Sequence, residues 1–460
     1  MKALPFAGVF CAVLSVCVIP CGGRAGDTPV AAKPNILVIL TDDQGRGDYS
    51  EFGTKGIRTP NMDRLFREGM TFHNFYANCC VCSPTRAALL TGCYPDRVGV
   101  PGVIREETPE ASWGYLSSRA TLLPQVLKPA GYHTAIIGKW HLGISSPNTP
   151  TERGFDFFCG FLGDMMDNYW THRRHGHNFM RRNLEEVDPK GHATDVFTDW
   201  ACEYLEDRDK AGGPFFLYLA YNAPHAPIQP PPEWLEKVKR REPGLSVKHA
   251  SYVALIEHLD AGVGKVLDTL DRTGLASNTL VIFTSDNGGV PPAGANNGPW
   301  RSGKMHMYEG GLRVPGAARW PGVVAPGSST DRMTLTMDIF ATACAVAGVA
   351  VPANIDGVSF LPELRGEAPP GTPRDLYFVR REGYSTYCGK TIEAFRRGDW
   401  KLVQDSPVAP LELYNLKSDP RETTDLARKE RRIVSQLVTA LCRQIQRSGS
   451  VPWQPPEGAQ

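Results

Sequence analysis

The stretch Asn35-Ile-Leu-Val-Ile-Leu-Thr-Asp-Asp43 decides the fold. Its apolar run is continuous rather than alternating, which predicts a strand covered on both faces, as in the parallel sheet of an α/β protein. Three later runs have the same texture, at residues 133–137, 215–219 and 279–283. We therefore predict that all four runs are buried parallel strands of one sheet.

Helical patterns lie between these runs, at residues 60–69, 122–130 and 249–270. Strands that alternate with helices predict an α/β fold in which a large, mostly parallel sheet is sandwiched by helices. After about residue 370 the pattern changes to short β-like runs at 376–379, 400–403 and 411–414, followed by a charged helical stretch at 428–447. We predict an N-terminal domain of residues 33–370 and a small C-terminal α+β subdomain of residues 371–460, with an antiparallel sheet and one helix.

The N-terminus has the layout of a secretory signal peptide. Lys2 precedes an apolar run from Ala3 to Ile19, and small residues follow from Cys21 to Gly26. The run is short for a membrane anchor, and Pro20 makes Cys21 a poor lipid-attachment site. We predict a signal peptide of residues 1–26, export to the periplasm or the medium, and no membrane span in the mature chain.

Composition excludes some partners. The chain of 460 residues has 42% hydrophobic and 22% charged residues and a net charge of +1, so bulk charge attracts neither nucleic acid nor an anionic membrane. We expect no nucleic-acid partner. Nine cysteines follow the predicted signal peptide, an odd number that leaves at least one free or altered, at positions 79, 80, 82, 93, 159, 202, 344, 388 and 442.

Polar side chains follow each predicted strand at the edge of the sheet where ligands bind in such folds. They are Asp42, Asp43, Lys139, His141, Asn222, His225, Asp286 and Asn287. Asp42, Asp43, Asp286 and Asn287 predict an all-oxygen metal site, which suits Ca²⁺ or Mg²⁺ better than zinc. Taken singly, each pair would more often be a helix cap or a turn.

A short helix is predicted beside Cys82. Ser83 suits its N-cap, Pro84 its first position and Gly92 its C-cap. Its free N–H groups and the charge of Arg86 would favour an anion. These residues alone leave two alternatives open, a thiol nucleophile in an electropositive environment and a disulfide cysteine ahead of a capped helix.

The stretch Cys82-Ser-Pro-Thr-Arg-Ala-Ala-Leu-Leu-Thr-Gly92 resembles the signature of the type I sulfatase family, formylglycine-dependent arylsulfatases and carbohydrate sulfatases of the alkaline-phosphatase superfamily. Further segments similar to that family follow in order over about residues 33–427. They are Asp42-Asp43, Gly138-Lys-Trp-His-Leu-Gly143, Pro224-His-Ala-Pro227, Asp286-Asn-Gly-Gly289, Gly303-Lys304, Tyr308-Glu-Gly-Gly311, Leu413-Tyr-Asn-Leu416 and Asp419-Pro420.

The resemblance implies a sulfuric ester hydrolase whose catalytic domain is residues 33–370. A maturation enzyme would convert Cys82 to 3-oxoalanine (formylglycine), whose hydrate attacks sulfur and later releases sulfate. A divalent cation, Ca²⁺ or Mg²⁺, would be held by Asp42, Asp43, Cys82, Asp286 and Asn287.

The same resemblance implies further roles in catalysis. Arg86 and Lys139 would orient the hydrate, and Lys304 would bind sulfate. His225 would protonate the leaving oxygen, and His141 would help to deprotonate the second hydroxyl. Lys139, His225 and Lys304 would thus be the substrate-binding residues.

The substrate is expected to be a sulfated small molecule or glycan. Many relatives place a small hydroxyl residue near the substrate after the segment matching Gly154–Gly160, whereas this chain has Phe161-Leu-Gly-Asp164-Met-Met-Asp-Asn-Tyr-Trp170. A basic and aromatic cluster of Tyr169, Trp170, Arg173, Arg174, Arg181 and Arg182 suggests a glycan subsite, although a solvated loop is the commoner meaning. The alternatives are a phosphonate or phosphate monoester hydrolase of the same superfamily, and a non-catalytic sulfoglycan-binding protein with unmodified Cys82.

Overall fold

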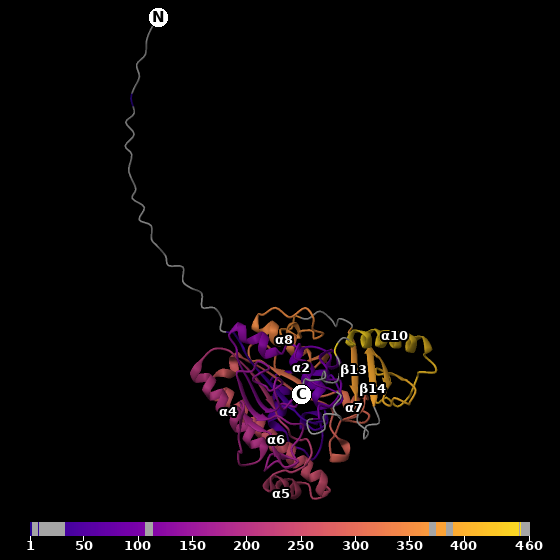
Figure 1. Ribbon diagram of the computed structural model, residues 1–460, viewed down its shortest axis with the longest axis horizontal. Coiled ribbons are helices and arrows are strands. Elements are labelled where there is room, and N and C mark those ends of the chain that lie inside the picture. Colours follow the sequence, from indigo (N-terminus) through magenta and orange to yellow (C-terminus); the bar gives the residue numbers. More distant parts are fainter. Residues whose placement is uncertain are drawn as a thin grey trace. The chain divides into compact units, whose positions relative to one another are not determined.

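The computed structural model describes residues 33–105, 114–367, 374–382, 390–449 and 451, with the isolated positions 1 and 8 (Figure 1). Apart from those two positions, the predicted signal peptide lies outside the described residues, and so do Cys21 and Cys388. Every element below belongs to the unit Lys33–Gln460.

The four predicted strands lie side by side in the centre of a ten-stranded sheet of order β12-β2-β11-β10-β1-β9-β3-β4-β7-β8. They are β1 (Asn35–Thr41), β3 (His133–Lys139), β9 (Phe215–Ala220) and β10 (Thr279–Ser285). β1 pairs in parallel with both β10 and β9, and β9 pairs in parallel with β3. Every residue of β1, β9 and β10 is buried, which explains their unbroken apolar sequences.

The flanks of the sheet are mixed. β4 (Phe157–Phe161) is parallel to β3, whereas β7 (Met180–Arg182) and β8 (Glu185–Glu186) are antiparallel. On the other side, β11 (Gly316–Arg319) runs antiparallel between β10 and β2 (Met70–Tyr76), and β12 (Ser328–Leu335) is parallel to β2. A separate two-stranded sheet pairs β5 (Arg173–Arg174) with β6 (His177–Asn178).

Helices cover both faces of the sheet because β1 buries alternate residues on opposite sides. Leu37 and Ile39 pack in one core with residues of α1 (Pro60–Arg67), α4 (Ala193–Ala211) and α6 (Val247–Arg272), and α5 (Pro232–Arg241) packs on α6. Ile36, Val38 and Leu40 pack in the other core with residues of α2 (Cys82–Thr91), α3 (Leu123–Leu127), α8 (Asp338–Ala347) and α9 (Leu361–Leu364). Figure 1 shows α4 and α6 on one side of the sheet and α2 and α8 on the other.

The predicted C-terminal antiparallel sheet is present, with strands in sequence order. It comprises β13 (Asp375–Arg381), β14 (Thr391–Arg397), β15 (Trp400–Gln404) and β16 (Glu412–Asn415), and α10 (Arg431–Ser448) packs against it. β14 was not predicted, because its sequence TIEAFRR is largely polar. One hydrophobic cluster joins these strands to Tyr76, Cys79 and Val81 just ahead of Cys82.

A buried ion network also ties this sheet to the short helix α7 (Glu309–Leu312). Lys401 Nζ lies 2.9 Å from Glu309 Oε1 and 2.8 Å from Glu422 Oε1. Within the described ranges, no helix combines the length and apolar composition needed to cross a membrane.

Candidate active site

The carboxyl ends of β1 and β10 bring two acidic pairs together. Asp42 and Asp43 follow β1, and Asp286 and Asn287 follow β10, its parallel neighbour. The Asp43 amide donates to Asp286 Oδ1 at 3.2 Å, and Asn287 Nδ2 donates to Asp43 Oδ1 at 2.7 Å. Asp43 has a φ of 65°, a left-handed conformation that is unfavourable for a non-glycine residue. Strain of this kind is commonly retained at functional sites.

Two oxygen atoms of these acidic pairs lack a hydrogen-bond partner and suit a hard divalent cation. Asp42 Oδ1 and Asn287 Oδ1 are buried and have no hydrogen-bond partner among the described residues. An unsatisfied buried acceptor costs about 1–3 kcal/mol, and metal coordination would satisfy it. Carboxylate and amide oxygens are the ligands that Ca²⁺ and Mg²⁺ prefer. Potential ligand atoms of Asp42, Asp43, Cys82 and His225 also lie within 4.8 Å of one another.

Two buried cations, Arg86 and Lys139, and the partly buried Lys304 balance this charge. Lys139 Nζ lies 2.5 Å from Asp42 Oδ2, Arg86 Nη2 lies 2.9 Å from Asp286 Oδ2, and Lys304 Nζ lies 2.7 Å from Asp43 Oδ1. Burial alone would raise the pKa of Asp42, but Lys139 and the other cations outweigh it and hold that pKa below its ordinary value. Burial and the Asp42 carboxylate raise the pKa of Asp286 well above its ordinary value. A divalent cation would relieve this crowding of carboxylates.

Cys82 begins α2, and its environment is electropositive. The residue is 3% exposed, and its thiol is free, which excludes the disulfide alternative for this conformation. Burial would raise the pKa of Cys82, but Lys139 and Lys304 outweigh it and lower the pKa to about 7. Positive charge around Cys82 favours an anionic ligand in this part of the structure.

The predicted helix is present, but its N-cap prediction was wrong. Val81, not Ser83, is the N-cap, so Pro84 falls in the first turn, where its missing N–H breaks no helical hydrogen bond. Ser83 Oγ instead accepts a hydrogen bond from the Ile104 amide at 3.1 Å. Gly92 is the C-cap, as predicted, with a left-handed φ of 69°.

His225 reaches the site from a loop after β9 that is rigidly held. Its Nε2 lies 3.5 Å from Asp43 Oδ2, and its Nδ1 lies 2.7 Å from the Ala226 carbonyl oxygen. The Tyr169 hydroxyl lies 2.9 Å from the Asn222 carbonyl oxygen and 2.8 Å from that of His225. Tyr169 is fully buried, so its predicted place in a glycan subsite is wrong, and it supports the His225 loop instead.

His141 lies at the end of β3 with a left-handed φ of 58°. Its Nε2 lies 3.0 Å from the Ile104 carbonyl oxygen, which fixes the ring with a proton on Nε2. The unprotonated Nδ1 is buried and has no hydrogen-bond partner in the described part of the chain. Burial and the Lys139 ammonium hold the pKa of His141 well below its ordinary value, so the ring is neutral in this structure.

A cavity of about 240 Å³ opens over Cys82. It is lined by Val81, Cys82, Val103, Arg105, His141, Asp164, Met165, His225, Lys304, Met305 and Arg380. Arg86 and Lys139 lie fully buried behind it. Sequence reasoning missed Arg105 and Arg380, which come from a loop and from β13 and belong to no motif, and left Asp164 without a role.

The predicted basic cluster does not line one surface. Arg182 belongs to a different cavity of about 160 Å³, shared with His133 and Trp200. Arg173 pairs with Asp188 and Arg181 with Glu186, both at the exterior. Arg174 alone of the four contacts a residue of the cavity over Cys82, because its Nε lies 3.0 Å from Asp164 Oδ1. The prediction of one shared subsite was therefore wrong.

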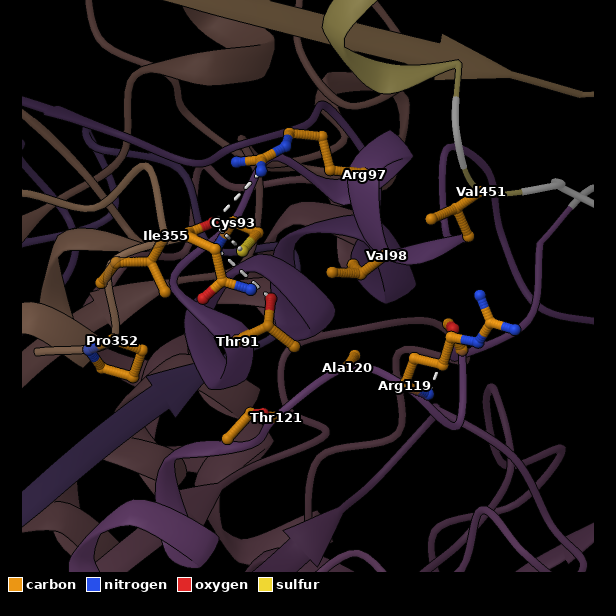
Figure 2. A pocket seen from close by; sticks show the side chains of 12 residues that line it. Thr91, Cys93, Arg97, Val98, Arg119, Ala120, Thr121, Pro352, Ile355 and Val451 are labelled. Carbon is orange, nitrogen blue, oxygen red and sulfur yellow. Dashed lines mark hydrogen bonds between the residues drawn. The ribbon is translucent and has the colours of Figure 1, made fainter.

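A further cavity of about 220 Å³ lies beyond the C-terminal end of α2, around Cys93, Arg97 and Arg119 (Figure 2). It contains none of the strand-end residues. A second group of possible ligands, His192, Asp195 and His258, joins α4 to α6. There His192 Nδ1 accepts from the Thr194 amide and caps α4, and His258 Nε2 lies 2.8 Å from Asp195 Oδ1 and connects α6 to α4.

Comparison with known proteins decides the family. A sequence-family model described as Sulfatase matches residues 34–349, the span that contains every strand-end residue above. The chain belongs to the sulfatase family. A second model, N-sulphoglucosamine sulphohydrolase, C-terminal, matches residues 300–448. The protein is therefore a sulfuric ester hydrolase with the predicted α/β fold.

Individual relatives are consistent with this family assignment. N-acetylgalactosamine-6-sulfatase of Mus musculus is 34% identical over 390 residues, which cover 80% of this chain and 71% of that protein. A sulfatase of Formosa agariphila is 32% identical over 471 residues, covering 86% and 84%. The crystal structure of Ps i-CgsB in complex with k-i-k-neocarrahexaose superposes with a TM-score of 0.83 at 30% identity, covering 92% of this chain and 95% of that one.

Proposed function

We propose that this sulfatase hydrolyses sulfate esters of carbohydrates, with Cys82 converted to formylglycine and a divalent cation bound at Asp42, Asp43, Asp286 and Asn287. The observation that carries the proposal is the position of Cys82, which lies on the cavity floor within 4.8 Å of Asp42, Asp43 and His225. The relatives named N-acetylgalactosamine-6-sulfatase, and the neighbour crystallised with a carrahexaose, support a carbohydrate substrate.

Formylglycine at residue 82 and the divalent cation supply chemistry that the standard side chains lack. The hydrated aldehyde supplies a diol, one hydroxyl for attack on sulfur and a second whose deprotonation releases sulfate, and the cation supplies Lewis acidity toward the sulfate oxygens. The unpartnered Asp42 Oδ1 and Asn287 Oδ1 support the cation, and the hard oxygen donors favour Ca²⁺, with Mg²⁺ as the alternative.

The cations of the site orient the sulfate group. Lys304 lines the cavity beside Asp43 and binds a sulfate oxygen there. Lys139 and Arg86 are buried and interact electrostatically with Cys82, so they orient residue 82 and neutralise developing negative charge. Preorganised charges in such a dry site require no rearrangement during the reaction.

The two histidines divide the proton transfers. His225 lies at the cavity side of residue 82 and its Nε2 is 3.5 Å from Asp43, so it protonates the departing sugar oxygen. Burial lowers the pKa of His225, but Asp43 and Asp42 outweigh burial and Lys304 and raise it. A raised pKa keeps the proton available for transfer. His141, whose Nδ1 has no hydrogen-bond partner among the described residues, would accept the proton of the second hydroxyl of the hydrate at residue 82.

The decisive experiment combines mass spectrometry with turnover. The chain is co-expressed with a formylglycine-generating enzyme, and the peptide containing residue 82 is weighed for aldehyde in place of thiol. The same preparation is then assayed for sulfate release from aryl sulfate and from defined sulfated sugars, with aryl phosphate in parallel. Aldehyde together with sulfate release supports the proposal. Faster turnover of phosphate would favour the phosphomonoesterase alternative, and unmodified thiol with glycan binding would indicate a binding protein.

Export is part of the same proposal. The apolar run from Ala3 to Ile19 supports a cleaved signal peptide, because no charged residue interrupts it. N-terminal sequencing of protein recovered from the periplasm or the medium tests this, and a new terminus near Ala25 is expected.

A further inference from the structure

Asp164 is the one acidic residue among the described residues that line the cavity over Cys82. It lies in the loop after β4, where the sequence departs from the family pattern. The other charged groups of the lining are cations or histidines, including Lys304, Arg105 and Arg380. A carboxylate in a cavity built for an anion is unfavourable unless it has a separate task.

Arg174 fixes this carboxylate in one orientation. Its Nη2 donates a hydrogen bond to Asp164 Oδ2 at 3.3 Å, and its Nε lies 3.0 Å from Oδ1 as an ion-pair contact. Its Nη1 donates to Asp167 Oδ1 at 2.8 Å. The Met165 amide also donates to Asp164 Oδ1. Both side chains of the pair are 18% exposed, so the carboxylate faces the cavity without being loosely solvated. Paired carboxylate oxygens keep lone pairs that accept further hydrogen bonds.

We propose that the Asp164–Arg174 pair determines specificity by accepting a hydrogen bond from a free hydroxyl of the sugar, close to the sulfated position. This inference rests on the proposed function and extends it to the substrate class. The cations around residue 82 hold the sulfate, and the carboxylate accepts from a neighbouring hydroxyl. A second sulfate in place of that hydroxyl has no proton to donate and meets like charge, so the site selects sugars that carry one sulfate in this region.

The test is competition against hydrolysis of 4-nitrophenyl sulfate. The competitors are N-acetylgalactosamine 6-sulfate and its 4,6-disulfate. For the native protein we expect the monosulfate to inhibit with a constant at least about tenfold lower than the disulfate, the usual scale for a charge-assisted hydrogen bond opposed by like charge. In Asp164→Asn and Asp164→Ala this preference should fall below about threefold.

Two further variants sharpen the result. Arg174→Ala releases the carboxylate from its fixed orientation and should also reduce the preference. Arg173→Ala is the matched control, because Arg173 is the preceding residue of β5 but pairs with the exterior Asp188, and it should keep the native preference. Thermal unfolding and the aldehyde content at residue 82 show that each variant is folded and matured.

Specific outcomes overturn the inference. An equal preference in native protein and Asp164→Ala would do so, as would failure of both sugars to compete. A parallel loss of aryl sulfate and sugar turnover with a displaced pH profile would show that Asp164 acts on the neighbouring His141 and not on the sugar. If native, matured protein does not hydrolyse 4-nitrophenyl sulfate or any sulfated sugar, the proposed function fails first, which is a different result.

Discussion

Lys304 Nζ lies 2.7 Å from Asp43 Oδ1, so a cation from a loop and a carboxylate at the end of β1 form an ion pair at the cavity wall. Asp43 and Cys82 raise the pKa of Lys304 above its ordinary value against the effect of burial. The ammonium therefore stays charged throughout the pH range in which the enzyme can work.

Replacing Lys304 by Met should remove the sulfate contact while keeping the length of the side chain. We expect kcat/KM for an aryl sulfate to fall by about 100-fold, the usual cost of losing one preorganised charge contact. Lys417→Met, at an exposed position, is the control and should retain native kinetics. A fall of less than about threefold in Lys304→Met would contradict the assigned role.

Removing divalent cations should inactivate the protein and also lower its stability. Ligands that bind only the folded state raise the free energy of unfolding by about 2.7 kcal/mol at 100 times their Kd. We expect the Tm of EDTA-treated protein to rise as Ca²⁺ is titrated in. Asn287→Leu, which removes the unpartnered Oδ1, should shift this titration to higher Ca²⁺ concentrations. A Tm that does not respond to Ca²⁺ or Mg²⁺ would contradict the metal site.

Tyr169→Phe should impair His225 without touching the substrate. Loss of the hydroxyl that contacts the Asn222 and His225 carbonyl oxygens would loosen the loop that carries His225, the proposed general acid. We expect about a tenfold lower kcat for a sugar sulfate, whose alkoxide leaving group needs protonation, and a smaller effect for 4-nitrophenyl sulfate. A purely structural role would lower both rates equally, and comparison of the two substrates distinguishes these results.

Lys401→Met should destabilise the fold strongly. The ammonium neutralises Glu309 and Glu422, all three being buried. Its removal takes the shared cation from both carboxylates and leaves Glu309 with Arg313, at 3.4 Å, as its ion partner. Breaking such a network costs about 3–5 kcal/mol, measured as the free energy of unfolding in urea. Lys417→Met should stay within about 0.5 kcal/mol of the native protein. A small effect at Lys401 would mean that water reaches this network.

The stability of the protein should depend on His192 at mildly acidic pH. Burial and the neighbouring His258 lower the pKa of His192 from 6.5 to about 4 in the folded state. The neutral ring therefore stabilises the fold fully above pH 6.5, and this contribution is lost as the pH falls toward the folded pKa. His192→Asn keeps an N-cap acceptor for α4 but does not titrate.

We expect the native protein to lose about 2–3 kcal/mol more than His192→Asn between pH 7 and pH 4, a figure that follows from the size of the pKa shift. Urea unfolding of both proteins across this range measures the difference. Parallel pH profiles would show that His192 keeps its ordinary pKa.

Prediction from the sequence was most successful for polar residues that directly follow buried parallel strands. The strands β1 and β10 are apolar throughout, and the carboxyl ends of parallel neighbours meet, so the proximity of Asp42 and Asp286 could be anticipated. The mixed parallel and antiparallel strands at the flanks of the sheet could not be anticipated. β2 and β12 contain polar stretches such as MTFHNFY and SSTDRMTL, whose half-buried positions resemble loops in a sequence.

Cavity residues that are distant from Cys82 in the sequence were not predicted, for a different reason. Arg380 comes from the C-terminal sheet and Arg105 from a loop, and no local pattern links either to Cys82. Tyr169 was placed in the glycan subsite because it adjoins basic residues, yet its hydroxyl contacts two carbonyl oxygens in the interior. The direction in which an aromatic side chain points depends on tertiary packing, which local polarity does not encode.

The burial of Cys82 limits when this residue could be modified during biosynthesis. All ten residues of α2 are buried, and the helix is packed between the main sheet and its covering layer. If Cys82 is converted to formylglycine as proposed, the modifying enzyme would have to reach a residue that is 3% exposed in the folded chain. The conversion would therefore have to precede folding. In a host that makes the chain faster than it oxidises the thiol, the product would be a well-folded but inert population that no later treatment of the intact protein could rescue.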